Sequence, residues 1–174
     1  MRIKRLLSIA LAIVLSGLFI TPALPAQEKK IGTKDLPAAV LAAFTKAYPH
    51  ARIKGASTEV EKGTTYYEIE SMDGTQARDI LYLADGTATE IEEVVLPAAL
   101  PVPVKTAVTA EFAKVKISKA ERVQRGAEFS YEVHVKLGSK SGSIVVSDSG
   151  KVLEKSPLKV KKEKKENEEE EEDD

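Results

Sequence analysis

The stretch Leu36-Pro37-Ala38-Ala39-Val40 recurs 64 residues later as Leu100-Pro101-Val102-Pro103-Val104. When each residue from 36 to 90 is set against the residue 64 positions further on, 13 of 55 pairs are identical without a gap. A repeat of this length indicates that one supersecondary unit has been duplicated. The sequence therefore predicts two similar units in tandem, one over residues 35–95 and one over residues 96–156.

Each unit opens with the pattern of an amphipathic helix. In the first unit, apolar side chains four residues apart form one stripe, made of Leu36, Val40, Phe44 and Tyr48. Asp35 is a good N-cap, Pro37 is tolerated in the first turn, and Pro49 ends the helix. The second unit repeats the stripe, but Pro101 and Pro103 crowd its start, so we expect that helix to begin one turn later.

Short segments with an alternating pattern follow each helix and are separated by tight turns. The predicted strands cover residues 53–61, 66–71, 77–83 and 87–95 in the first unit, and 116–124, 129–137, 143–147 and 151–154 in the second. Four such strands make an antiparallel meander, and one helix can cover one of its faces. The predicted fold class is α+β, with two tandem repeats of one helix packed on a four-stranded antiparallel β-meander. A unit of about 60 residues has a marginal core, so we expect the two units to pack together or to join their sheets.

The two ends of the chain have compositions unlike that of the repeats. Residues 1–26 combine a basic start, an apolar run of 15 residues and small residues, which predicts a signal peptide cleaved after Ala26 or, as a second choice, after Ala23. An uncleaved anchor is the alternative, but the run is short for a bilayer, which needs about 20 residues. Without a cysteine to carry a lipid, the mature protein is expected to be released, periplasmic or secreted, with no membrane anchor. Residues 27–34 are predicted to be a linker, and residues 157–174 a disordered charged tail.

The distribution of charge limits the classes of partner. The whole chain has a formal net charge of −1, and the charges of the repeats nearly cancel, which argues against nucleic-acid binding. The acidic tail lacks the fixed oxygen cage of a tight calcium site, so we expect it to bind divalent cations only weakly. A cation-binding or cation-sensing envelope protein, which would use its surface carboxylates and this tail, is kept as the alternative function.

Alternation along the strands assigns their side chains to two faces. The helix must cover Tyr67 and Ile69, because successive strand residues point to opposite faces. The other face is then the candidate partner-binding surface, and it carries Tyr66, Glu68, Glu70, Glu132 and His134. An ordinary solvated sheet face is the alternative interpretation.

Residues that could carry catalysis do not form a recognisable motif. The chain has no cysteine, and its two histidines, His50 and His134, lie at non-equivalent places without a metal-binding spacing. Glu92 and Glu93 are adjacent strand residues, so their carboxylates point to opposite faces and cannot act together. We predict no enzymatic activity, no catalytic residues, no cofactor and no metal site.

Several short motifs are shared by the two units. The first unit has Leu36-Pro37, Tyr48-Pro49, Tyr67-Glu68-Ile69 and Asp85-Gly86, and the second has Leu100-Pro101, Tyr131-Glu132-Val133 and Gly150-Lys151-Val152-Leu153. In these motifs, residues 36–155 resemble the PepSY-like domains, also called β-lactamase-inhibitor-like domains. The resemblance implies a periplasmic or secreted helix-on-sheet protein that binds an unidentified extracytoplasmic protein or peptide. Related domains occur in propeptides of thermolysin-type metallopeptidases, where inhibition is proposed, so the resemblance also implies inhibition of an envelope or secreted enzyme.

Overall fold

The computed structural model of the chain describes residues 28–160. The predicted signal peptide of residues 1–26 and the part of the predicted tail beyond residue 160 lie outside the described residues. Within this range, no helix has the length and apolar character needed to cross a membrane.

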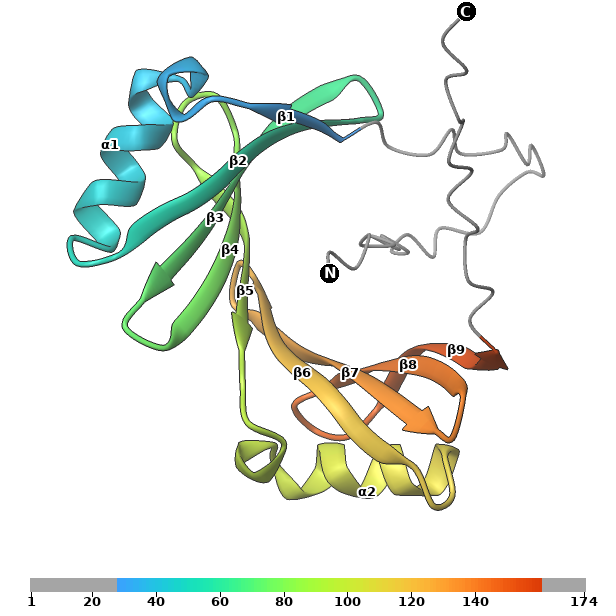
Figure 1. Cartoon of the computed structure of the whole chain (residues 1–174). Helices are drawn as coiled ribbons and strands as arrows, with labels where there is room; N and C mark the ends of the chain where they lie inside the picture. Colours follow the sequence, from blue (N-terminus) through green and yellow to red (C-terminus); the bar gives the residue numbers. More distant parts are fainter. Residues whose placement is uncertain (1–27, 161–174) are drawn as a thin grey trace, which may run out of the picture.

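Within residues 28–160, nine antiparallel strands form one sheet, in which the order of the strands follows the chain from β1 to β9. The first half contains β1 (Lys29–Ile31), a 3-10 turn (Thr33–Asp35), α1 (Ala38–Ala47), β2 (Arg52–Glu61), β3 (Thr64–Asp73), β4 (Gln76–Tyr82) and β5 (Ala88–Val94). The second half contains a 3-10 turn (Pro97–Ala99), α2 (Val102–Glu111), β6 (Lys116–Arg125), β7 (Glu128–Leu137), β8 (Lys140–Ser147) and β9 (Val152–Val160). Figure 1 shows that the sheet is curved and that both helices lie on its convex side, one near each end.

The two repeats are joined edge to edge through β5 and β6. These strands pair antiparallel, with Ile91 opposite Gln124 and Val94 opposite Glu121. The predicted α+β fold is therefore confirmed, and of the two arrangements left open by the sequence, the joined sheet is the one observed.

The duplication extends to irregular features of the backbone. A register shift lies between Ile53 and Gly55 in β2, and another lies 64 residues later between Ile117 and Lys119 in β6. The turns before β5 and β9 both place a glycine at positive φ, +88° at Gly86 and +90° at Gly150. These matching irregularities show that the two repeats share backbone geometry as well as sequence.

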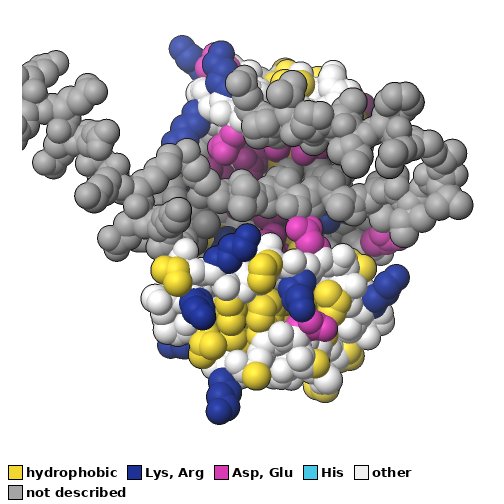
Figure 2. Space-filling view, turned by 90° about the vertical axis from the view of Figure 1, so that its right-hand side faces the viewer, with side chains coloured by type: hydrophobic (Ala, Val, Ile, Leu, Met, Phe, Trp, Pro, Cys, Tyr) yellow, Lys and Arg dark blue, Asp and Glu magenta, His cyan; other side chains and the backbone are white. Residues whose placement is uncertain are grey.

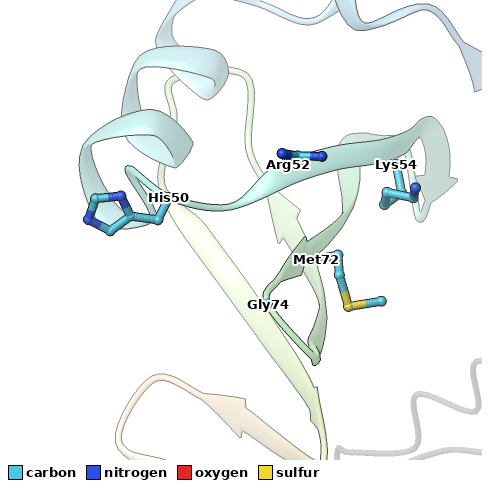
Figure 3. Close-up of a pocket in the computed structure, with 5 residues that line it drawn as sticks. All are labelled: His50, Arg52, Lys54, Met72 and Gly74. Carbon is cyan, nitrogen blue, oxygen red and sulfur yellow. The ribbon is translucent and has the colours of Figure 1, made fainter.

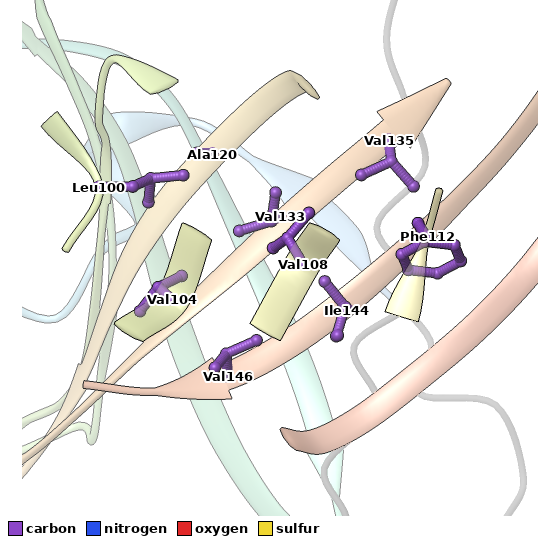
Figure 4. Close-up of a cluster of buried hydrophobic side chains, with 9 residues drawn as sticks. All are labelled: Leu100, Val104, Val108, Phe112, Ala120, Val133, Val135, Ile144 and Val146. Carbon is purple, nitrogen blue, oxygen red and sulfur yellow. The ribbon is translucent and has the colours of Figure 1, made fainter. Parts of the chain in front are cut away.

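Each helix closes its own hydrophobic core against the convex face of the sheet. The first core consists of Leu36, Val40, Phe44, Ala56, Ile69, Ile80 and Tyr82. The second, drawn in Figure 4, consists of Leu100, Val104, Val108, Phe112, Ala120, Val133, Val135, Ile144 and Val146. Burying a side chain of this kind stabilises the fold by about 1.5–3 kcal/mol. The apolar stripe of each helix, predicted from the sequence, thus packs against the strand residues that were predicted to face it.

The starts of both helices differ from the prediction. Asp35 does not cap α1, because it lies in the preceding 3-10 turn, where its carboxylate accepts a hydrogen bond from the Gly32 backbone N–H at 3.1 Å. Pro37 occupies the N-cap position instead. The second helix begins at Val102, the equivalent of Ala38, and not one turn later. Prolines are compatible with this start because the first N–H groups of a helix have no partner within it.

Strands extend past the predicted limits of the repeats at both ends of the described residues. β1 lies inside the predicted linker of residues 27–34, where it pairs with β2 and places Ile31 against the first core. β9 continues to Val160, four residues into the predicted tail of residues 157–174. Leu158 packs against the second core, and Pro157 lies beside a register shift in the pairing with β8, where its missing N–H is tolerated. The backbone hydrogen bonds to β8 and one partly buried leucine outweigh the charged composition there.

Candidate functional site

The concave side of the sheet, opposite both helices, is called the free face below. Ile69, Ile80 and Val133 are fully buried in the cores on the other side, so their chain neighbours point to the free face. The five residues predicted for partner binding therefore all lie on this face: Tyr66, Glu68 and Glu70 on β3, and Glu132 and His134 on β7.

These five residues form two separate groups. β3 and β7 are separated in the sheet by β4, β5 and β6. On β7, His134 Nε2 lies 3.3 Å from Glu132 Oε1, so those two side chains contact each other. The sequence thus assigned these two groups to the free face and missed the residues that lie between them.

The centre of the free face is a cluster of carboxylates from three neighbouring strands. One ligand atom each from Asp79 on β4, Glu92 on β5 and Glu121 on β6 lie within 4.8 Å of one another. Glu121, Glu132 and His134 form a second group with the same spacing. Figure 2 shows acidic side chains in the hollow between the two repeats. No sequence motif reveals this cluster, because it exists only where β5 pairs with β6.

Glutamates on the free face are buried to an unusual degree. The relative exposures of Glu68, Glu90, Glu92 and Glu121 are 7%, 5%, 7% and 4%. Buried carboxylates are tolerated only with hydrogen-bonded or charged partners. Lys119 Nζ lies 2.7 Å from Glu121 Oε1, and Ser57 Oγ donates to Glu68 Oε2 at 3.0 Å. These contacts offset part of the cost of burying Glu121 and Glu68.

One of these carboxylates is only half satisfied. Arg125 Nε donates to Glu90 Oε2 at 2.8 Å, whereas Glu90 Oε1 is buried and has no hydrogen-bond partner among the described residues. Two buried apolar side chains, Leu81 and Val123, lie on the same face, and Leu81 is directly opposite Glu90 across β4 and β5. This part of the free face therefore combines a carboxylate oxygen without a hydrogen-bond partner with neighbouring apolar side chains.

The negative charge of the free face is reflected in the ionisation of Glu132. Burial raises the pKa of Glu132, and the neighbouring charges of Glu92 and Glu121 raise it further, although His134 acts in the opposite direction. The carboxylates of the two repeats therefore repel one another across the β5–β6 junction.

On the convex side of the same β5–β6 junction, a cluster contains two arginines and one glutamate. Glu93 Oε1 accepts from Arg78 Nε at 2.8 Å, and its Oε2 accepts from Arg122 Nη2 at 2.5 Å. The Tyr48 ring lies 4.3 Å from the Arg78 guanidinium carbon. As the sequence predicted, the side chains of Glu92 and Glu93 lie on opposite faces of the sheet. The Glu93 contacts connect the two repeats through side chains.

A shallow pocket at one end of β2 is basic. His50, Arg52 and Lys54 line it together with Met72 and Gly74, and the three basic side chains are exposed. Figure 3 shows Arg52 and Lys54 on β2 and His50 in the turn before it, without the three side chains converging on one point. This arrangement gives His50 no partner group for acid–base chemistry in the pocket.

Comparisons with known proteins agree with the duplicated architecture. The family model described as "Putative beta-lactamase-inhibitor-like, PepSY-like" matches residues 24–87 and residues 65–154. No curated protein matches the chain.

Solved structures share the fold at low sequence identity. A "putative periplasmic" protein from Bacteroides eggerthii is 19% identical, with a TM-score of 0.60 over 71% of this chain and 89% of that one. A DUF2874 family protein from Bacteroides uniformis is 18% identical, with a TM-score of 0.59 over 70% of this chain and 88% of that one. A BLIP-like protein from Bacteroides fragilis is 20% identical, with a TM-score of 0.53 over 72% and 88%. At such identities the likeness is one of fold.

Proposed function

The chain belongs to the PepSY-like, beta-lactamase-inhibitor-like family, and on that basis we propose that it is an exported, non-enzymatic module that binds a protein or peptide. The binding surface is the free face of the sheet, including Tyr66, Glu68, Glu70, Glu132 and His134. The observation that carries the proposal is the single continuous sheet, whose concave side faces away from both helices.

The dimensions of the free face suit a protein partner. Neighbouring strands lie about 4.8 Å apart and rise about 3.4 Å per residue. Eight strands from β2 to β9, each with roughly seven residues in the sheet, therefore present about 800 Å². A stable protein interface buries about 800 Å² on each partner, so the free face is large enough for one.

Inhibition of an envelope or secreted enzyme is the more specific form of the proposal. Its support is the description of the family and of the BLIP-like structure from Bacteroides fragilis. A concave surface of this kind can cover a protruding loop of an enzyme, which would block access without any chemistry of its own. The periplasm or the medium is the compartment that fits both the predicted signal peptide and the periplasmic description of a similar structure.

The test is a capture experiment with matched charge reversals. Mature protein starting at Gln27 is used to capture proteins from an envelope fraction, in parallel with Glu70→Lys, Glu132→Lys and the control Asp148→Lys. Asp148 is exposed in the turn between β8 and β9. We expect the specific partner to be retained by the control and lost from both free-face variants. A fifth bait, which ends at Val160, identifies proteins held only by the charged tail. A partner kept equally by all the charge variants would rule out the free face.

The carboxylate cluster favours divalent-cation binding as a second candidate function. The ligand atoms of Asp79, Glu92 and Glu121 are close enough to share one ion. Oxygen ligands from carboxylates are those that calcium prefers. If an ion is bound there, 1 mM Ca²⁺ should raise the Tm relative to EDTA, and the rise should disappear in Glu121→Gln but persist in Asp148→Asn. An unchanged Tm would exclude this function for the free face.

A further inference from the structure

Strand β5 carries two glutamates that are bound by arginines in different ways. On the convex side, each oxygen of Glu93 accepts from a different arginine, Oε1 from Arg78 and Oε2 from Arg122. On the free face, Glu90 accepts from Arg125 through Oε2 alone. Its Oε1 is buried and has no hydrogen-bond partner within residues 28–160.

An open carboxylate oxygen in a buried position is an unusual feature. Buried polar atoms are nearly always paired, and leaving a charged acceptor unpaired is costly. Glu90 is 5% exposed, so bulk water does not readily replace the missing donor. The geometry of Glu93 shows that a glutamate of this strand can hold one guanidinium on each oxygen. Glu90 Oε1 can therefore accept a hydrogen bond from a second cationic group.

The surroundings of Glu90 suit the rest of a basic side chain. Leu81 lies directly opposite it on β4 and is 7% exposed, and it offers an apolar surface to a methylene stem. Glu92 is two residues further along the same face, and its carboxylate lies within 4.8 Å of those of Asp79 and Glu121. Together they give the negative charge that attracts and orients a cation.

We infer that Leu81, Glu90, Glu92 and Arg125 form a subsite for an arginine or lysine side chain of the bound protein or peptide, called the Glu90 subsite below. The inference rests on the proposed function, because it names the chemistry of the partner at the same face. The partner presents a protruding basic residue to the centre of the free face. Its stem lies on Leu81, and its charged end donates to Glu90 Oε1.

A basic side chain fits the Glu90 subsite better than a metal ion does. Calcium takes six to eight oxygen ligands, and Arg125 places a fixed positive charge beside Glu90. That charge repels a divalent ion more strongly than a singly charged guanidinium, and two arginines already share Glu93 in this protein. Arginine is favoured over lysine because its guanidinium is weakly hydrated and loses less on burial.

The test uses a small basic probe and the full mature chain. The affinity for the capped peptide acetyl-Arg-Arg-Arg-amide is measured by calorimetry for the wild type, Glu90→Gln and the matched control Asp148→Asn. Acetyl-Gln-Gln-Gln-amide serves as the neutral probe. The charged tail is the same in all three proteins, so its contribution cancels in the comparison. A hydrogen bond to a charged group is worth about tenfold or more in affinity. We therefore expect Glu90→Gln to bind triarginine at least about tenfold more weakly than Asp148→Asn.

The location of binding gives a second readout that does not depend on a variant. In the wild type, triarginine should shift backbone amide NMR signals of β4, β5 and β6. Shifts confined to the residues beyond Val160, or equal affinities of Glu90→Gln and Asp148→Asn, would overturn the inference. Circular dichroism confirms that Glu90→Gln is folded, and if it is not, the amide shifts of the wild type decide alone.

Failure of this inference can be told apart from failure of the proposed function. If Glu90→Gln captures the envelope partner as well as the wild type while Glu70→Lys and Glu132→Lys lose it, the Glu90 subsite is refuted and the free face remains the binding surface. If Glu90→Gln, Glu70→Lys and Glu132→Lys all lose the partner, the result supports both the Glu90 subsite and the proposed function. If all of these variants keep the partner, both the Glu90 subsite and the free face as the binding surface are refuted.

Discussion

Glu93→Gln tests whether the side chains at the junction hold the two repeats together. The carboxylate of Glu93 bridges Arg78 of β4 and Arg122 of β6, so it spans the boundary between the repeats. Glutamine keeps the size of the side chain but has one oxygen and one NH₂ group. Whichever way the amide is turned, its NH₂ faces an arginine donor, so one of the two contacts is lost and the other loses its charge.

The expected cost follows from the burial of the three groups. Removing one partner of a buried ion pair typically costs about 3–5 kcal/mol. The Arg78 side chain is 11% exposed and Glu93 is 18% exposed, but Arg122 is 40% exposed and can be rehydrated. We therefore expect the low end of the range, about 3 kcal/mol, which corresponds to a fall in Tm of roughly 10 °C for a domain of this size.

The pH dependence gives the prediction a second, independent signature. Burial acts to raise the pKa of Glu93, but the hydrogen bonds and charges of Arg78 and Arg122 outweigh it and hold the pKa below its ordinary value of 4.5. A carboxylate with a lowered pKa in the folded state stabilises the protein above its unfolded-state pKa, and this stability is lost as the pH falls through the folded pKa. The wild type and Glu93→Gln should therefore differ most at pH 7 and converge in acid.

Urea denaturation at pH 7 and at pH 3 measures both quantities, with Asp148→Asn as the control for the change of charge. An unfolding free energy of Glu93→Gln within about 0.5 kcal/mol of the control at pH 7 would refute a stabilising bridge. A difference that stays constant down to pH 3 would refute its ionic origin.

Two further substitutions test the helix contact and the charge of the free face. Gly86→Ala would place a Cβ 2.6 Å from the carbonyl oxygen of Ala39, so thermal unfolding should show a larger loss than Gly63→Ala, which has a similar φ of +83° with no atom within 4 Å. The Gly63 variant should lose only the conformational cost of about 1–2 kcal/mol, and equal losses would contradict the contact. Glu132→Gln should raise the Tm slightly at pH 7, because burial first, and then its acidic neighbours, raise the pKa of Glu132 and make the ionised form unfavourable. That gain should vanish in acid, where both side chains are neutral, and a lower Tm at pH 7 would contradict the repulsion.

Most elements of the fold could be predicted because their signals are local. The stripe that includes Val40 and Phe44 has the period of a helix, and Tyr67 and Ile69 alternate as strand residues do, so their faces follow from geometry alone. The errors lie at the ends of elements. Asp35 and Pro157 have clear local preferences, but a different local contact, with Gly32, uses the Asp35 carboxylate, and pairing with β8 places Pro157 in a strand.

The candidate site was predicted less completely than the fold. Glu68 and Glu132 could be assigned to the free face because each follows a tyrosine that faces the helix side. Asp79, Glu90 and Glu121 gave no such signal, since a single carboxylate on a predicted strand is common and indicates no partner. Their grouping depends on which strands are neighbours, and strand neighbours were predicted only inside each repeat.

The sequence by itself determined that this protein has two copies of one helix-and-meander unit, because duplication and periodicity are properties of residues close together in the chain. Only the tertiary structure decided that β5 pairs with β6, which brings Glu92 next to Glu121 and leaves one oxygen of Glu90 open. The physical reason is that pairing between strand edges is made by backbone groups that every residue carries. Nothing in the side-chain pattern of either repeat therefore specifies which strand edges meet.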